Sequence, residues 1–173
     1  MASIGLFYGS TTGNTLKVAE MIQEAFGTDE VDIFDVREAT AEMLNDYNVL
    51  VLGTSTWHWG GLQDEWADFE ENLSKVRLKG KKVALFGLGD QKRYPDNFVD
   101  GIGLLYDRIK PLGIKLIGMW PTKGYDFDQS AGRIGDKFVG LAIDEDNEPG
   151  KTGQRVTQWV SQLKKELALA GPK

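Results

Sequence analysis

Strand-like and helix-like hydrophobic patterns alternate along the whole chain, and this alternation constrains the fold more than any other feature. Two runs of apolar residues, 49–53 (VLVLG) and 83–88 (VALFGL), are bounded by turn residues. Such runs are typical of parallel strands that are buried on both faces. Between them apolar residues recur at helical spacing, at Leu62, Trp66, Phe69 and Leu73. The pattern predicts a parallel sheet with helices on both faces, in which these two strands are central.

The other elements are predicted from the same patterns. Further strands are expected at 4–8, 31–36, 114–120 and 138–143, and further helices at 18–26, 39–44, 98–109 and 156–167. The alternating aspartates of 31–36 indicate a strand at the edge of the sheet. The polar, glycine-rich stretch 121–136 is longer than the roughly 12 to 15 residues of most loops in compact domains. We therefore expect an insertion that splits the last strand.

Length and composition limit the possible functions. A chain of 173 residues favours one domain spanning 1–173, and the absence of cysteine excludes thiolate chemistry, disulfides and iron–sulfur ligation. The net charge of −6 argues against nucleic acid as a partner, although it also simply favours solubility. No stretch approaches the roughly 18 apolar residues of a membrane span. The sequence predicts a soluble cytoplasmic protein whose redox chemistry, if any, comes from a bound cofactor.

The loop after the first strand, residues 9–15 (GSTTGNT), consists of small uncharged residues. A helix N-terminus that follows such a loop can bind a phosphate through its backbone N–H groups. The loop lacks the lysine and the spacing of a nucleoside-triphosphate loop, so a single phosphate monoester fits better. The alternative is an ordinary strand-to-helix turn with a capping residue.

Two aromatic loops follow the central strands and are expected at the same edge of the sheet as the first loop. Residues 54–61 read TSTWHWGG, and residues 87–97 read GLGDQKRYPDN. A flat aromatic ligand could stack on Trp57 or on Tyr94. Alternatively, one of the two tryptophans, Trp57 or Trp59, packs inward.

Together these motifs resemble those of long-chain flavodoxins, and the resemblance covers essentially the whole chain. It rests on FYGSTTGNT, TWHWG, LFGLGDQ with Tyr94, and GYDFDQS followed by KFVGLAIDEDN. The resemblance implies a flavodoxin-like, doubly wound five-stranded parallel sheet in the order 2-1-3-4-5, with FMN as the cofactor. The stretch 120–137 matches the loop that distinguishes long-chain members, and its role stays open.

The resemblance also implies which residues hold FMN. The phosphate loop corresponds to Ser10, Thr11, Thr12, Gly13, Asn14 and Thr15, and the aromatic residues beside the ring to Trp57 and Tyr94. Thr56 is expected beside the phosphate or the ribityl chain, and Asp146 is expected at the ribityl chain. The turn near the reactive ring edge comprises His58, Trp59 and Gly60. The loop at the pyrimidine edge contributes Gly89, Asp90 and Asn97. No catalytic acid, catalytic base or metal ligand is implied.

The resemblance implies a low-potential one-electron carrier, not an enzyme, that exchanges electrons with redox partner proteins. The acidic stretch 64–71 is suited to orient a partner with a basic docking surface, and a monomer is expected. The alternative is an FMN-dependent NAD(P)H:quinone reductase, for which the chain shows no additional substrate motif. A receiver domain would have acidic residues in place of GSTTGNT and TSTWHWGG, so we exclude it.

Two positions depart from the pattern expected of the family. Lys92 and Arg93 place two cations in a loop where acidic or neutral residues are usual. These cations either raise the flavin potential or alter the choice of redox partner. The alternative is a solvated pair that has no influence on the flavin ring. His58, the single histidine, is either a group that titrates near the flavin or a residue that faces solvent.

Overall fold

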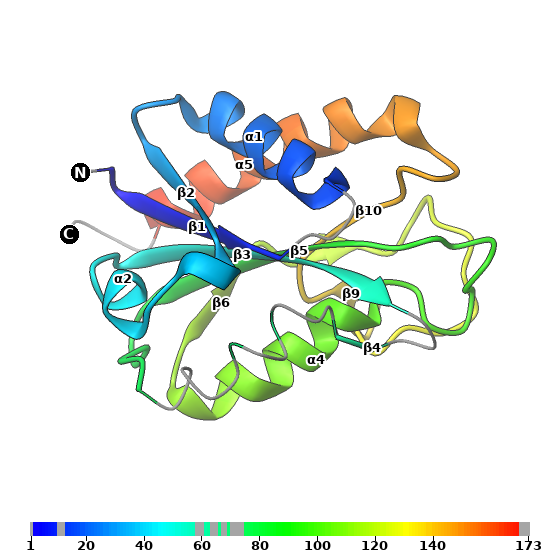
Figure 1. The fold of residues 1–173 in the computed structure, drawn as a ribbon. Coiled ribbons are helices and arrows are strands. Elements are labelled where there is room, and N and C mark those ends of the chain that lie inside the picture. The colour runs from blue at the N-terminus through cyan, green and yellow to red at the C-terminus, as the bar shows by residue number, and fades with distance from the viewer. Residues whose placement is uncertain are drawn as a thin grey trace.

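A parallel sheet forms the central layer of the computed structural model, which describes residues 2–9, 13–57, 61–62, 66, 69 and 75–169. Helices α1 (Asn14–Phe26) and α5 (Thr152–Leu169) cover one face, and α4 (Asp100–Ile109) covers the other (Figure 1). The short helix α2 (Ala41–Asn45) lies beside the sheet edge, and Thr40 caps it by accepting a hydrogen bond from the backbone N–H of Met43.

The strand order confirms the predicted arrangement. The main strands are β1 (Ile4–Tyr8), β2 (Val31–Asp35), β3 (Val49–Trp57) and β5 (Lys82–Leu88), and they run in the order β5-β3-β1-β2, all parallel. β2 forms the edge, as its aspartates predicted, and β3 lies between β1 and β5. The short strand β4 (Gly61–Leu62) pairs antiparallel with the end of β3.

The fifth position of the sheet is shared by two short strands, which confirms that the last strand is split. β6 (Lys115–Ile117) pairs with the first half of β5, and β10 (Leu141–Ile143) pairs with its second half. The 23 residues between them, 118–140, include a small antiparallel sheet of β7 (Trp120–Pro121), β9 (Lys137–Phe138) and β8 (Arg133–Ile134). We call this segment the insertion.

The predicted strands 114–120 and 138–143 are both too long, and two glycines explain why. At Gly118 the backbone takes a left-handed φ of 79°, and its carbonyl accepts a 2.8 Å hydrogen bond from the Trp159 indole of α5. At Gly140 the chain passes so close to β5 that a Cβ would lie 2.0 Å from the Leu85 carbonyl oxygen. The chain therefore leaves the sheet after β6 and rejoins it only at Leu141.

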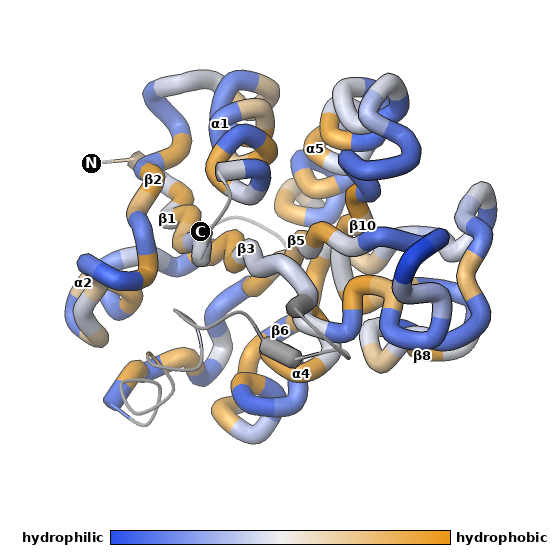
Figure 2. Tube along the Cα trace, turned by 45° about the vertical axis from the view of Figure 1, so that its right-hand side comes forward, coloured by the Kyte–Doolittle hydropathy of each residue, from blue (hydrophilic) through white to orange (hydrophobic). Residues whose placement is uncertain are grey.

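The core has two layers, one on each side of the sheet. On one face the buried residues of α1 and α5, including Val18, Ile22 and Trp159, pack on the strands. On the other face Ile102 and Leu105 of α4 pack with Trp66. Figure 2 shows the hydrophobic residues concentrated along the central strands and on the inward sides of the helices.

The helix predicted between Leu62 and Leu73 lies mostly outside the described residues. Trp66 and Phe69 are described, and both are helical and buried, with ring centroids 5.8 Å apart. The Trp66 indole donates a 2.6 Å hydrogen bond to the Gly53 carbonyl of β3. The predicted helices 98–109 and 156–167 differ from α4 and α5 only at their ends. A 3₁₀ turn at Lys110–Leu112 follows α4, and another at Pro149–Lys151 precedes α5. Within the described part of the chain, no helix has the length and apolar character needed to cross a membrane.

The insertion is fixed to the first turn of α4 and to the residues just before that helix. The Ala131 backbone N–H donates a 2.6 Å hydrogen bond to the Asp100 carboxylate, and the Ser130 hydroxyl donates to the Phe98 carbonyl. Gly103 allows this contact because a Cβ there would lie 2.1 Å from the Ala131 carbonyl oxygen. The insertion thus packs against the end of the loop that follows β5 and holds it in place.

Candidate functional site

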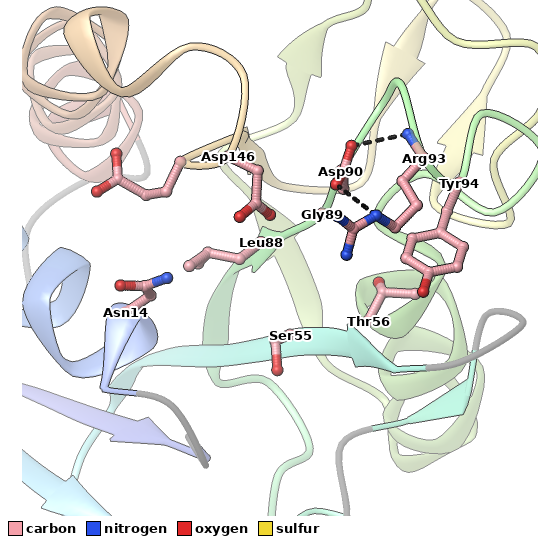
Figure 3. Close-up of a pocket in the computed structure, with 10 residues that line it drawn as sticks. Asn14, Ser55, Thr56, Leu88, Gly89, Asp90, Arg93, Tyr94 and Asp146 are labelled. Carbon is pink, nitrogen blue, oxygen red and sulfur yellow. Dashed lines mark hydrogen bonds and ion pairs between the residues drawn. The ribbon is translucent and has the colours of Figure 1, made fainter.

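A cavity of about 430 Å³ opens at the carboxyl ends of β3 and β5, next to the N-terminus of α1. Ligands of open parallel α/β sheets bind at this edge, where the strand order reverses. Figure 3 shows the lining side chains converging from the strand ends and the loops after them. The described lining residues are Asn14, Ser55, Thr56, Leu88, Gly89, Asp90, Arg93, Tyr94, Glu145 and Asp146.

The structure brings many of the predicted site residues together. Asn14, Thr56, Gly89, Asp90, Tyr94 and Asp146 all line the cavity. Thr15 is buried and is not among the lining residues, and Asn97 instead donates a 3.1 Å hydrogen bond to the Asp100 carboxylate. Predictions for Ser10, Thr11, Thr12, His58, Trp59 and Gly60 and for the side chain of Trp57 fall outside the described residues.

The start of α1 forms one end of the cavity. Gly13 precedes the helix with a φ of 90°, and Asn14 is the first helical residue. The first turn of α1, which the structure describes completely, contains no acidic residue. The helix therefore presents backbone N–H groups and the positive end of its dipole without a carboxylate of its own to neutralise them.

The loop after β5 holds Tyr94 at the opposite end through a turn around Asp90. The Asp90 carboxylate accepts hydrogen bonds from the backbone N–H groups of Lys92 (3.1 Å) and Arg93 (2.8 Å) and from the Asn147 amide (2.8 Å). The Tyr94 N–H donates to the Asp90 carbonyl at 2.9 Å. Partial burial would raise the pKa of Asp90, but these hydrogen bonds outweigh it and lower the pKa.

Thr56 joins the cavity to α4. Its hydroxyl oxygen accepts a 2.9 Å hydrogen bond from the backbone N–H of Gly101, one of the unpaired donors in the first turn of that helix. A threonine hydroxyl has one hydrogen to donate in addition. The side chain therefore anchors the end of β3 while it retains a donor for a ligand.

Acidic groups dominate the charge of the cavity. Burial, followed by the charges of Asp90 and Asp144, raises the pKa of Asp146. Glu145 forms a 2.6 Å ion pair with Lys17 of α1. Among the described lining residues Arg93 is the single cation, and its Nε lies 3.9 Å from an Asp90 carboxylate oxygen.

Sequence reasoning missed four lining residues: Ser55, Leu88, Arg93 and Glu145. Ser55 and Glu145 are sequence neighbours of the predicted Thr56 and Asp146, so a wider window around each strand end would have included them. Arg93 was singled out as unusual but was not assigned to the site.

Sequence reasoning also missed Gln91, which is buried behind the cavity and joins three loops. Its backbone N–H donates to Asp144 at 3.1 Å, and its side-chain amide donates to Glu148 at 2.8 Å. Its side-chain carbonyl accepts a 2.6 Å hydrogen bond from the Asp126 N–H of the insertion. No local pattern reveals this role, because the partners lie 35 to 57 residues away.

These features define an open parallel α/β protein with a ligand cavity at the switch point of its sheet. The sequence model of the family described as Flavodoxin matches residues 6–159. The chain belongs to the flavodoxin family.

Individual relatives match along almost their whole length. The flavodoxin of Synechococcus elongatus is 49% identical over 170 residues, which cover 98% of this chain and all of that relative. Flavodoxin 1 of Escherichia coli K12 is 46% identical, covering 98% of this chain and 97% of its own length. Among solved structures, Fusobacterium nucleatum flavodoxin bound to flavin mononucleotide superposes with a TM-score of 0.89 at 32% identity, covering 96% of this chain and 99% of that one.

Proposed function

We propose that this protein binds one FMN non-covalently in the cavity and transfers single electrons between redox proteins. Membership of the flavodoxin family supports this function, together with the FMN in the Fusobacterium nucleatum relative. The observation that carries the proposal in this chain is that the two ends of the cavity suit the two ends of FMN. A helix N-terminus suited to a phosphate lies at one end, and the aromatic side chain of Tyr94 lies at the other.

The residues present fit FMN. The cavity volume of about 430 Å³ lies in the range of roughly 300 to 1,000 Å³ that small-molecule sites occupy. Gly13 and Asn14 would hold the phosphate through backbone N–H groups and the side-chain amide. Thr56 and Asp146 offer polar groups to the ribityl chain, and Tyr94 offers a flat surface to the ring. The roles expected for Thr15, Asn97 and the residues outside the described ranges stay predictions.

The chain supplies the environment of the cofactor, and no general acid or base is needed for electron transfer. When bound, FMN supplies the one-electron chemistry, while charged and hydrogen-bonding side chains around it set its potential. The carboxylates near the cavity favour a low potential, because they disfavour additional negative charge.

Several finer features are part of the same proposal. The insertion 118–140 is consistent with a long-chain flavodoxin. We take the chain as a single FMN-binding domain that works as a monomer in the cytoplasm. We expect neither nucleic acid nor a membrane among its partners. Its redox partners would dock through basic surfaces against the acidic stretch 64–71, whose net charge is negative.

An anaerobic reduction of the FMN-saturated protein tests this function. We expect an oxidised flavin spectrum and a long-wavelength absorbance that rises with the first electron and falls with the second. Direct two-electron reduction together with steady NADPH:quinone turnover would favour the quinone reductase instead. If the protein retains no flavin, the assignment of the cavity is wrong.

The phosphate end of the cavity can be tested separately with the apoprotein. We expect FMN to bind at least about tenfold more tightly than riboflavin, because riboflavin lacks the anion that the N-terminus of α1 attracts. The preference should decrease at high salt, where screening is stronger. Titrations that follow the quenching of flavin fluorescence measure both affinities. Equal affinities would contradict the placement of the phosphate at α1.

A further inference from the structure

The two neighbouring cations of the loop after β5 face different parts of the molecule. Arg93 lines the 430 Å³ cavity, and Figure 3 shows its side chain extending between Asp90 and Tyr94. Lys92 instead lines a separate pocket next to Gly124 and Asp126 of the insertion. The structure therefore separates two residues that the sequence presents as a pair.

We propose that Arg93 raises the potential of the second one-electron step by placing a positive charge in the FMN cavity, and that Lys92 does not. This inference rests on the proposed function, because it assumes that FMN occupies the cavity. It assigns to Arg93 a role in tuning the cofactor that its neighbour lacks.

The charges around the cavity give the direction of the effect. In the second step a redox partner gives up one electron and no proton accompanies it, so the negative charge of the bound cofactor increases by one. Asp90 and Asp146 oppose this change, whereas the guanidinium of Arg93 favours it. The Glu145 charge is offset by Lys17, 2.6 Å away, so Arg93 chiefly offsets the other two carboxylates.

The geometry of the loop allows the charge of Arg93 to be removed without dismantling the site. The hydrogen bonds that hold Asp90 come from the backbone N–H groups of Lys92 and Arg93 and from Asn147. The Arg93 side chain is 74% exposed, and its Nε lies 3.9 Å from an Asp90 carboxylate oxygen, which is the distance of a loose ion pair. A glutamine at position 93 keeps the backbone bonds and much of the side-chain length.

Exposure limits the size of the effect. An exposed charge pair at contact distance in water changes an equilibrium constant by about fivefold. For Arg93→Gln we therefore expect the fully reduced cofactor to bind about fivefold more weakly relative to the one-electron-reduced cofactor. At about 59 mV per tenfold for a one-electron couple, the potential falls by about 40 mV. The affinity for oxidised FMN should change by less than this factor, because the oxidised ring is neutral and the phosphate lies at the opposite end of the cavity from Arg93.

The experiment compares Arg93→Gln, Arg93→Lys and Lys92→Gln with the wild type, all as FMN-loaded proteins. Lys92→Gln is the matched control, because it removes the same charge one residue away. Both one-electron potentials are measured by anaerobic spectroelectrochemical titration at about 0.1 M and about 1 M salt, between which the Debye length falls from about 10 Å to about 3 Å. The affinity of each apoprotein for oxidised FMN is measured in parallel.

The expected result is a lower second potential in Arg93→Gln alone, restored in Arg93→Lys and reduced in size at high salt. An unchanged potential in Arg93→Gln, or equal shifts in Arg93→Gln and Lys92→Gln, would overturn the inference while the proposed function stands. If the wild-type protein binds no FMN, the proposed function and the inference both fail, and the wild-type spectrum alone reveals it.

Discussion

Replacing Gly140 with alanine should destabilise the protein by about 3 kcal/mol or more. The new Cβ would lie 2.0 Å from the carbonyl oxygen and 2.5 Å from the carbonyl carbon of Leu85. Both atoms belong to the backbone of β5, so a rotamer change cannot relieve the overlap, and overpacking a dense core costs about 1 to 3 kcal/mol even where side chains can adjust. β10 should therefore separate from the second half of β5.

Urea unfolding of the apoprotein measures this loss. Gly150→Ala is the matched control, because a Cβ there would meet no described atom within 4 Å apart from the adjoining residues of the chain. This control should not lower the free energy of unfolding and should raise it by up to about 1 kcal/mol, because alanine restricts the unfolded chain more than glycine does. FMN affinity should also fall in Gly140→Ala, since Glu145 and Asp146 lie two and three residues after the end of β10. A Gly140→Ala protein as stable as the control would show that β10 does not approach β5 this closely.

The long elements of this fold could be predicted from local pattern, whereas the ends of the fifth strand could not. The runs 49–53 and 83–88 are apolar throughout, so burial on both faces was evident without any tertiary information. β6 and β10 are only three residues long each. Their limits are set by Gly118 against Trp159 and by Gly140 against Leu85, which are contacts between segments distant in sequence.

The candidate site, too, could be predicted only in part from the sequence. Parallel strands place their carboxyl ends at one edge, so the segments 9–15, 54–61 and 87–97, which include Asn14, Thr56 and Tyr94, could be predicted to meet. The direction of individual side chains could not be predicted, because it depends on neighbours from other loops. Lys92 and Arg93 are adjacent in sequence, yet they line different pockets.

Glu148 links the structure behind the cavity to the start of α5. Its carboxylate accepts hydrogen bonds from Lys151 (2.6 Å), Gln91 (2.8 Å) and Arg155 (3.0 Å). The Arg155 guanidinium in turn lies 4.1 Å from the centre of the Tyr125 ring in the insertion. One carboxylate therefore connects the loop after β5, the insertion and α5.

This position of Glu148 predicts a specific dependence of stability on pH. Burial would raise the pKa of Glu148, but the hydrogen bonds from Lys151, Gln91 and Arg155 prevail and lower it from 4.5 to about 2. A carboxyl group whose pKa is lowered by folding stabilises the protein above its unfolded pKa, and this stability is lost as the pH falls through the folded pKa. The contribution of Glu148 should therefore be complete at pH 7 and disappear between about pH 4.5 and about pH 2.

Glu148→Gln should accordingly destabilise the protein by about 1 to 3 kcal/mol at pH 7. One pKa unit corresponds to about 1.4 kcal/mol of stability. The Lys151 side chain is exposed, so solvent screens its interaction with Glu148 and the loss is smaller than the whole pKa shift would give. The difference in the free energy of unfolding between wild type and variant, measured by urea unfolding, should shrink steadily below about pH 4.5.

The control for this prediction is Glu24→Gln, which removes the same charge from an exposed position on α1. It should change the free energy of unfolding by less than about 0.5 kcal/mol at pH 7. A cost of Glu148→Gln that is equal at pH 7 and pH 3 would contradict the ionic origin of this link, because between these pH values the unfolded chain takes up a proton at Glu148 while the folded protein, with a pKa of about 2, largely does not.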